Sequence, residues 1–222
     1  MKTALILLAG GTGTRMRSTT PKQFLPLKGK VLALHSLEVF LSMSEFSEIV
    51  IVCAKEFRHL FSPYANKATI HFAEPGRRRQ DSVYNGLQQI SLPSDYVCIH
   101  DSARPLIDVT LVTRALTAAQ EHGAATVGMP IKFTIKECCS SQLVTTTPDR
   151  SKYWEIQTPQ VIKTDLLKSG FEHILKHQID VTDDVSIVEL LGHPVKLVEG
   201  SYNNLKVTTP EDLAVAKSFL RK

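Results

Sequence analysis

The chain has 222 residues, of which 43% are hydrophobic, with 26 Lys and Arg against 22 Asp and Glu. This length suits one domain, residues 1–222, that buries roughly 70–75% of the surface of its unfolded chain. The net charge of +4 fits an anionic small ligand and does not by itself indicate nucleic acid, and no apolar stretch is long enough to span a membrane.

Apolar patterns predict strands and helices that alternate along most of the chain. Continuous apolar runs are typical of buried parallel strands, and spacings of three and four residues indicate helices packed on a sheet. The expected strands are 4–8, 49–53, 68–72, 96–100, 124–129, 194–198 and 205–209. The expected helices are 31–41, 56–61, one ending near 89, 111–121, 164–176, one opening at 181–184, and 210–219. This order predicts an α/β fold with a doubly wound, mostly parallel sheet.

Residues 131–150 depart from this pattern. Residues 131–136 alternate between apolar and polar side chains, and 143–147 are expected to pair back on them as an antiparallel strand. A hairpin of this size has too little core of its own. We therefore expect a β-arm that stands off the main sheet and packs on another subunit.

The four cysteines do not form a metal-binding or disulfide pattern. Cys53 and Cys98 lie inside apolar runs, and Cys138 and Cys139 are neighbours without the two-residue spacer of a zinc knuckle. We expect reduced thiols in a cytoplasmic protein, because the N-terminal apolar run meets glycines after Leu8 and lacks the apolar core of a signal peptide.

A glycine-rich segment, Gly10-Gly11-Thr12-Gly13, directly follows the first predicted strand. Glycines allow positive φ and a close approach to phosphate oxygens, while Arg15 and Lys22 supply positive charge. Ligands bind at the carboxyl ends of strands in open α/β sheets, so we interpret the segment as a triphosphate cradle. The patterns of a P-loop and of a dinucleotide fingerprint are absent. A tight turn whose glycines only relieve strain is the alternative.

Three consecutive arginines, 77–79, follow a Pro-Gly turn after the strand 68–72. A solvated helix start is the commonest explanation, and one triplet without aromatic neighbours gives weak support for nucleic-acid binding. The position of Gly76 and Ser82 after a strand, at the same sheet edge as the glycines, favours contact with the edge of a nucleotide.

Two charged residues, Asp101 and Lys206, lie at the end of or within predicted strands, where a charged side chain is unusual. Asp101 ends the strand 96–100, a place where one carboxylate plus substrate phosphates holds a hard cation such as Mg²⁺; a turn cap or an ion pair with Arg104 is the alternative. Lys206 lies between Leu205 and Val207, where a lysine is costly to bury unless it meets an anion. The alternative for Lys206 is a side chain that snorkels to solvent.

Two other polar pairs have simpler explanations. His173 and His177 have the i, i+4 spacing of a zinc site, but His-Glu-x-x-His and a third ligand are missing, so a solvated helix face is preferred. Asp183 and Asp184 suit the N-terminus of a helix, where the helix dipole favours negative charge.

Taken together, six motifs resemble those of the 2-C-methyl-D-erythritol 4-phosphate cytidylyltransferases of the non-mevalonate isoprenoid pathway. They run nearly from end to end and comprise Leu8 to Met16, Pro21-Lys22-Gln23, His100 to Pro105, Gln157-Thr158-Pro159-Gln160, Thr182-Asp183-Asp184 and Asn204 to Thr208. Ribitol-5-phosphate cytidylyltransferases are similar in the same places, and the segments 79–83 and 182–184 favour the erythritol family. The sequence departs from the family pattern at Arg77, often acidic, and at Ser102, usually alanine.

The resemblance implies a Rossmann-like nucleotidyltransferase that uses CTP, a sugar-alcohol phosphate and Mg²⁺, and a homodimer that exchanges the β-arm 131–150. It implies catalytic roles for Arg15, Lys22 and Lys206, and metal binding by Asp101. The nucleotide would be bound by Ala9, Gly10, Gly11, Gly13, Gly76, Ser82 and Asp101. The alcohol phosphate would be bound by Arg104, Thr158 and Thr182, and by Thr134 and Arg150 from the partner's arm.

Two other functions remain open from the sequence. One is the ribitol-5-phosphate activity, and the other is a non-catalytic nucleotide-binding regulatory protein on the same fold, because fold does not determine function. The charged set Arg15, Lys22, Asp101 and Lys206 favours an enzyme, since a binding module has no need for a metal carboxylate beside the α-phosphate.

Overall fold

A computed structural model describes residues 1–11, 13–16 and 18–220, and Thr12 of the glycine-rich segment lies outside these residues. Its main sheet has seven strands in the order β11-β7-β10-β6-β1-β4-β5. The strands are β1 (Thr3–Leu8), β4 (Phe46–Val52), β5 (Thr69–Ala73), β6 (Tyr96–Asp101), β7 (Ala124–Pro130), β10 (Trp154–Lys163) and β11 (Lys196–Glu199). Only β10 runs antiparallel to its neighbours in this sheet of the described chain, which confirms the predicted mostly parallel fold.

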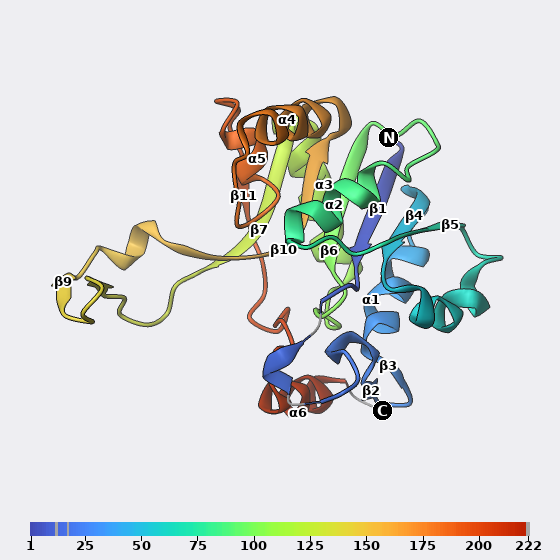
Figure 1. Cartoon of the computed structure of the whole chain (residues 1–222), viewed down its shortest axis with the longest axis horizontal. Coiled ribbons are helices and arrows are strands. Elements are labelled where there is room, and N and C mark those ends of the chain that lie inside the picture. Colours follow the sequence, from blue (N-terminus) through green and yellow to red (C-terminus); the bar gives the residue numbers. More distant parts are fainter. Residues whose placement is uncertain (12, 17, 221–222) are drawn as a thin grey trace.

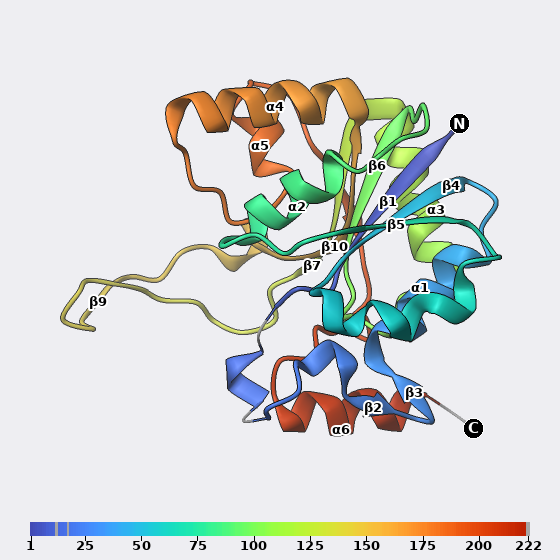
Figure 2. The same cartoon turned by 45° about the vertical axis from the view of Figure 1, so that its right-hand side comes forward.

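Helices cover both faces of the sheet (Figures 1 and 2). On one face, α1 (Leu32–Leu41) and α3 (Val109–His122) share a core with the strands, together with the 3-10 helix η3 (Lys55–Tyr64). On the other face lie α2 (Arg79–Leu87), α4 (Thr164–His177) and α5 (Ser186–Glu189). Because both faces are covered, strands such as β1 are apolar and buried almost throughout.

The hairpin of β2 (Pro26–Leu27) and β3 (Lys30–Val31) and the helix α6 (Pro210–Phe219) lie below the main sheet in Figure 2, and a smaller apolar cluster joins them. The buried side chains of this cluster include Leu27 and Val207. A capping box between Thr209 and Asp212 begins α6. The cluster therefore brings the segment after η2 (Lys22–Phe24) next to the segment before α6.

The arm projects away from the body of the molecule (Figure 1). Its hairpin pairs β8 (Glu137–Cys138) with β9 (Val144–Thr146), and all residues of both strands are exposed. An antiparallel hairpin is confirmed, but the strand predicted at 131–136 is wrong, because β9 pairs with 137–138 instead. No residue of 131–136 is buried in the described chain, so their alternation has no core face to serve. Phe133 is 78% exposed, and Leu143 is 69% exposed.

Two other predictions of local structure need correction, and one strand was missed. The segment 205–209 is not a strand; it lies beyond the sheet and packs on α6 instead. The helix expected to open at 181–184 begins at Ser186, although Asp183 still accepts a hydrogen bond from the Ser186 amide at 3.2 Å. The strand β10 was not predicted.

Cys53 and Cys98 are buried, Cys138 and Cys139 are exposed, and all four are unpaired thiols. No described helix is long and apolar enough to cross a membrane.

Candidate active site

The site lies where the order of the strands reverses. The chain leaves β1 towards β4 on one side, and later returns to β6 on the other side of β1. Leu8 and Asp101 are register partners at the carboxyl ends of β1 and β6. The glycine-rich segment and the Asp101 loop therefore leave neighbouring strands at the same edge, which is where open α/β sheets bind ligands.

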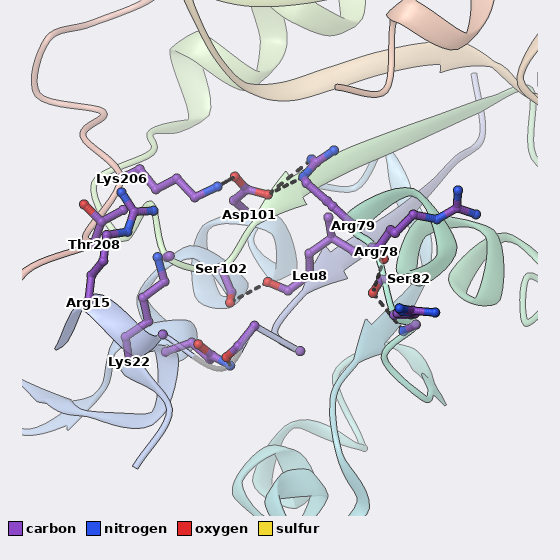
Figure 3. A pocket seen from close by; sticks show the side chains of 17 residues that line it. Leu8, Arg15, Lys22, Arg78, Arg79, Ser82, Asp101, Ser102, Lys206 and Thr208 are labelled. Atoms are coloured by element: carbon purple, nitrogen blue, oxygen red, sulfur yellow. Dashed lines mark hydrogen bonds and ion pairs between the residues drawn. The ribbon is translucent and has the colours of Figure 1, made fainter. Parts of the chain in front are cut away.

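A cavity of about 390 Å³ opens at this edge (Figure 3). Nearly all of the residues predicted to bind the nucleotide or act on it line this cavity: Gly10, Gly11, Gly13, Arg15, Lys22, Gly76, Ser82, Asp101 and Lys206. Ala9 is the exception, because it is buried below the loop and its carbonyl accepts a hydrogen bond from Gln23 at 2.7 Å. The structure thus brings together segments that are up to 196 residues apart, from Gly10 to Lys206.

The glycines serve three different purposes. Gly13 has φ +66°, which favours glycine, whereas Gly10 and Gly11 do not use the positive φ that glycine allows. A Cβ on Gly10 would lie 2.6 Å from the Pro75 side chain. A Cβ on Gly11 would meet no atom within 4 Å. Gly11 therefore leaves space for a ligand, while Gly10 lets two loops approach each other.

Gln23 fixes the glycine-rich loop from below. Its side-chain amide donates to the carbonyls of Ala9 at 2.7 Å and Gly11 at 2.9 Å. This buried residue belongs to the Pro21-Lys22-Gln23 motif, but no local pattern in the sequence assigns it a physical role. By occupying these carbonyls, Gln23 holds the loop in one conformation around the cavity.

Positive charge gathers at one end of the cavity, where Figure 3 shows Arg15, Lys22 and Lys206. Lys22 Nζ donates to the Val207 carbonyl at 2.7 Å. Burial, the neighbouring charge of Lys206 and that of Arg15 lower the pKa of Lys22 to about 8, although Asp101 opposes them. Because crowded cations raise each other's free energy, this end of the cavity favours an anion.

Asp101 lies between two cations. Lys206 Nζ is 2.6 Å from Asp101 Oδ2, and Arg79 Nη2 is 3.2 Å from Asp101 Oδ1. Burial alone would raise the pKa of this carboxyl, but the charges of Arg79 and Lys206 hold it well below its usual range. The ion pair with Arg104 that the sequence left open is not formed, and the anion that Lys206 meets is Asp101.

Arg79 is a site residue that sequence reasoning missed. Its guanidinium also makes a bidentate pair with the buried Asp184, at 2.7 and 2.8 Å. Burial lowers the pKa of Arg79, but Asp184 and Asp101 outweigh it and raise the pKa further above its usual value. The solvated helix start suits Arg78, which pairs with Asp81 and Asp180, but not Arg79. Only the tertiary fold shows which of the three arginines contacts both Asp101 and Asp184.

A second cavity, of about 450 Å³, adjoins the first. Three residues line both cavities: Arg79, Asp101 and Lys206. Arg104, Thr158 and Thr182, which the resemblance assigned to the alcohol, line only the second. The ion pairs of Asp101 therefore form a shared wall between the two cavities.

Arg104 is a buried cation on the second cavity, only 8% exposed. Within the described chain it makes no salt bridge: Nη1 donates to the Asn204 carbonyl at 2.7 Å, and Nε has no hydrogen-bond partner. Burial lowers its pKa, an effect that Asp101 only partly offsets. A buried guanidinium with a free donor is suited to bind an anionic group in this cavity.

The remaining predicted residues lie on the arm or away from the site. Thr134 is exposed and Arg150 donates to the Lys132 carbonyl at 2.5 Å, and neither lines the two cavities. His173 and His177 lie on α4 with ring centroids 4.6 Å apart, and no group of three potential metal ligands occurs in the described chain.

Comparisons with known proteins show the family of this chain. A family model for 2-C-methyl-D-erythritol 4-phosphate cytidylyltransferase matches residues 3–222. The chloroplastic enzyme of that name from Oryza sativa subsp. japonica is 49% identical over 221 residues, which are 99% of this chain and 74% of the relative. The chain belongs to the 2-C-methyl-D-erythritol 4-phosphate cytidylyltransferase family. A family member from Chlamydia pneumoniae is 40% identical, with 99% of this chain and 100% of the relative covered.

Solved structures of the cytidylyltransferase family have the same fold. The 4-diphosphocytidyl-2C-methyl-D-erythritol synthase of Anaerococcus prevotii has a TM-score of 0.87 at 27% identity, and 100% of this chain and 99% of that one are covered. The cytidylyltransferase of Thermus thermophilus has a TM-score of 0.80 at 30% identity, with 98% of each chain covered. The predicted family and the Rossmann-like nucleotidyltransferase fold are confirmed.

Proposed function

We propose that this chain transfers a cytidylyl group from CTP to 2-C-methyl-D-erythritol 4-phosphate. A phosphate oxygen of the alcohol attacks the α-phosphorus of CTP in line, the bond to the β-phosphate breaks, and the products are the CDP-alcohol and pyrophosphate. The observation that carries this proposal is the pair of cavities with one shared wall, because two anionic substrates in them would meet at Asp101, Arg79 and Lys206.

The first cavity is assigned to CTP. Arg15, Lys22 and Lys206 would bind the triphosphate at the cationic end, and the space above Gly11 would admit phosphate oxygens close to the backbone. Gly76 and Ser82 would lie at the cytosine. The Ser82 hydroxyl already accepts from the Gly76 amide at 2.9 Å, which fixes the shape of this end of the cavity.

The second cavity is assigned to the alcohol phosphate. Arg104 would bind its phosphate or orient its hydroxyl groups, and Thr182 would contact the alcohol. No protein nucleophile is needed, because the substrate phosphate attacks and pyrophosphate leaves with its own charge. The contribution of the chain is alignment and stabilisation of charge that develops during transfer.

The site chemistry fits a divalent cation of the Mg²⁺ type. Asp101 is a carboxylate on both cavities, and Mg²⁺ is commonly held by one or two carboxylates together with substrate phosphates. Asp101 would hold the ion, which when bound neutralises charge on the phosphate oxygens. Lys206 and Arg79 keep this carboxylate ionised and point it at the boundary of the cavities.

We also propose that the chain works as a homodimer whose arms, 131–150, carry Thr134 and Arg150 to the partner's substrate phosphate. The exposure of Phe133 and Leu143 supports this, because apolar side chains so far from the core call for a partner surface. A mixture of Arg150→Ala and Asp101→Asn chains tests it. Each mixed dimer has one complete site, so about a quarter of the wild-type activity returns if the arms exchange; no recovery in verified mixed dimers contradicts the assignment.

Release of pyrophosphate tests the reaction. The chain is given CTP and Mg²⁺ with 2-C-methyl-D-erythritol 4-phosphate, and in parallel with ribitol 5-phosphate. We expect turnover with the erythritol substrate and much less with ribitol 5-phosphate. Preference for ribitol 5-phosphate would change the substrate, and CTP binding without turnover on either alcohol would favour a regulatory binding protein. A cytoplasmic location stays a prediction.

A further inference from the structure

Thr158 takes the place of a missing strand contact beside Asp101. The pairing of β10 with β6 ends at Gln160 and Ile99. The residue of β10 that precedes Gln160 is Pro159, which has no amide hydrogen to donate. The Asp101 amide donates instead to the Thr158 hydroxyl oxygen at 3.0 Å. On the side of β10, a side chain and not the backbone ladder therefore holds the main chain at Asp101, whereas on the other side Asp101 pairs with Leu8 of β1.

The same hydroxyl contacts the buried His100. Thr158 Oγ1 lies 3.1 Å from His100 Nδ1, and His100 Nε2 lies 3.3 Å from the Arg104 carbonyl. One arrangement satisfies every group: the hydroxyl donates to Nδ1, and Nε2–H donates to the carbonyl. Both ring nitrogens of this completely buried side chain then have a partner, and the ring is the neutral tautomer with its hydrogen on Nε2.

The single hydrogen of the Thr158 hydroxyl is therefore donated within the protein, to His100. Thr158 is only 4% exposed, and its hydroxyl serves as acceptor for one protein group and donor for another. The Thr158 carbonyl accepts from the Asn204 side chain at 2.9 Å, and the Asn204 carbonyl accepts from Arg104. These hydrogen bonds link Thr158 directly to Asp101, which ends β6, and through Asn204 to Arg104, which follows β6.

We propose that Thr158 and His100 are positioning residues with separate targets. Thr158 fixes the Asp101 main chain and so aims the carboxylate at the shared wall, whereas His100 fixes the turn that carries Arg104 into the second cavity. The inference rests on the proposed function, in which Asp101 holds the divalent cation and Arg104 binds the alcohol phosphate. It differs from the resemblance, which places Thr158 in direct contact with the alcohol.

Thr158→Val keeps the shape and removes the hydroxyl, and Thr158→Ser is its matched control. In Thr158→Val the Asp101 amide loses its hydrogen-bond partner, so we expect amide hydrogen exchange at Asp101 to rise about tenfold or more. We expect Mn²⁺ binding in the presence of CTP, followed by electron paramagnetic resonance, to weaken about tenfold, and kcat to fall by a similar factor. The KM for the alcohol phosphate stays within about twofold, and Thr158→Ser resembles wild type.

His100→Asn gives the opposite pattern. Its side-chain oxygen can still accept from Thr158, but the donor to the Arg104 carbonyl is lost. We expect unchanged Mn²⁺ binding and unchanged exchange at Asp101, with a KM for the alcohol phosphate that rises about three- to tenfold. This variant keeps the proposal testable if Thr158→Val does not fold.

Three results would overturn the proposal. The first is a Thr158→Val variant that raises only the KM for the alcohol phosphate, which would show that the hydroxyl contacts substrate. The second is the same profile in both variants, and the third is a loss in Thr158→Ser as large as that in Thr158→Val. Failure of the proposed function gives a different result: wild type shows no turnover, while exchange at the Asp101 amide still separates Thr158→Val from Thr158→Ser.

Discussion

Asp101→Asn separates catalysis from stability most clearly. The substitution keeps the size of the side chain and removes the charge that faces Lys206 at 2.6 Å and Arg79 at 3.2 Å. Arg79 keeps its bidentate bonds to Asp184, so the principal change is at Lys206 and at the boundary of the cavities.

The expected loss of stability follows from the exposure of the partners. The side chains of Lys206 and Asp101 are 37% and 9% exposed. We therefore expect about 2 kcal/mol, between the roughly 3–5 kcal/mol of a broken buried pair and the 0–1 kcal/mol of a surface pair. For a chain of this size, the melting temperature falls by about 4–8 °C.

Turnover is expected to fall much further, on the order of 10²–10³-fold, since a charged group that acts on the transferred phosphate is removed. Binding of CTP without metal, measured by calorimetry in chelator, should strengthen, because the carboxylate no longer repels the triphosphate. Mg²⁺ should then add little to CTP affinity. This combination of stronger metal-free binding and lost metal dependence is specific to a metal carboxylate.

Asp184→Asn is the matched control. It removes a carboxylate that is also paired with Arg79, but Asp184 is 1% exposed and lines neither cavity. We expect a larger loss of stability, about 3–5 kcal/mol, and a smaller loss of turnover in protein that remains folded. Mg²⁺-dependent turnover close to wild type in folded Asp101→Asn, or an equal loss in both variants at saturating substrate, would refute the reasoning.

Further predictions concern Lys22 and the glycines. The pKa of Lys22 is about 8 in the free protein, and a bound triphosphate raises it. Above pH 8, CTP binding should therefore take up a proton and weaken as the pH rises. Calorimetry in two buffers measures this proton uptake, which Lys22→Met should abolish. Lys22→Met should also lower turnover on the order of 10²–10³-fold, and retained turnover at saturating CTP would contradict its role. Gly10→Ala should lower the melting temperature, since its Cβ would lie 2.6 Å from Pro75. Gly11→Ala should leave the melting temperature unchanged and weaken CTP binding. If thermal melts and CTP titrations instead show a lower melting temperature for Gly11→Ala and weaker CTP binding for Gly10→Ala, Gly11 does not border the ligand.

The sequence predicted which strand ends carry polar groups, and this proved enough to find the first cavity. Gly10, Gly13 and Asp101 were identified because glycines and a lone acid directly after apolar runs are unusual where a strand ends. Parallel strands bring such ends to one edge regardless of the details of packing. Lys206 was identified for a similar reason, since a lysine between apolar residues requires a compensating charge.

What each charge meets was decided only by the tertiary structure. Arg79, Asp184 and Gln23 act through partners distant in sequence, and no local pattern distinguishes Arg79 from Arg77 or Arg78. The antiparallel strand β10 was likewise missed, because Gln157 to Gln160 show neither a continuous apolar run nor a strict alternation. The family resemblance implies that Thr158 contacts the alcohol phosphate, and only the fold places its hydroxyl between Asp101 and His100.

The sequence by itself therefore determined the fold class, the family resemblance and the edge of the sheet where the site lies, since hydrophobic periodicity and strand-end chemistry are local properties. The tertiary structure decided the shared wall of the two cavities and the networks that hold it. These depend on hydrogen bonds and ion pairs between segments that only chain folding brings within reach.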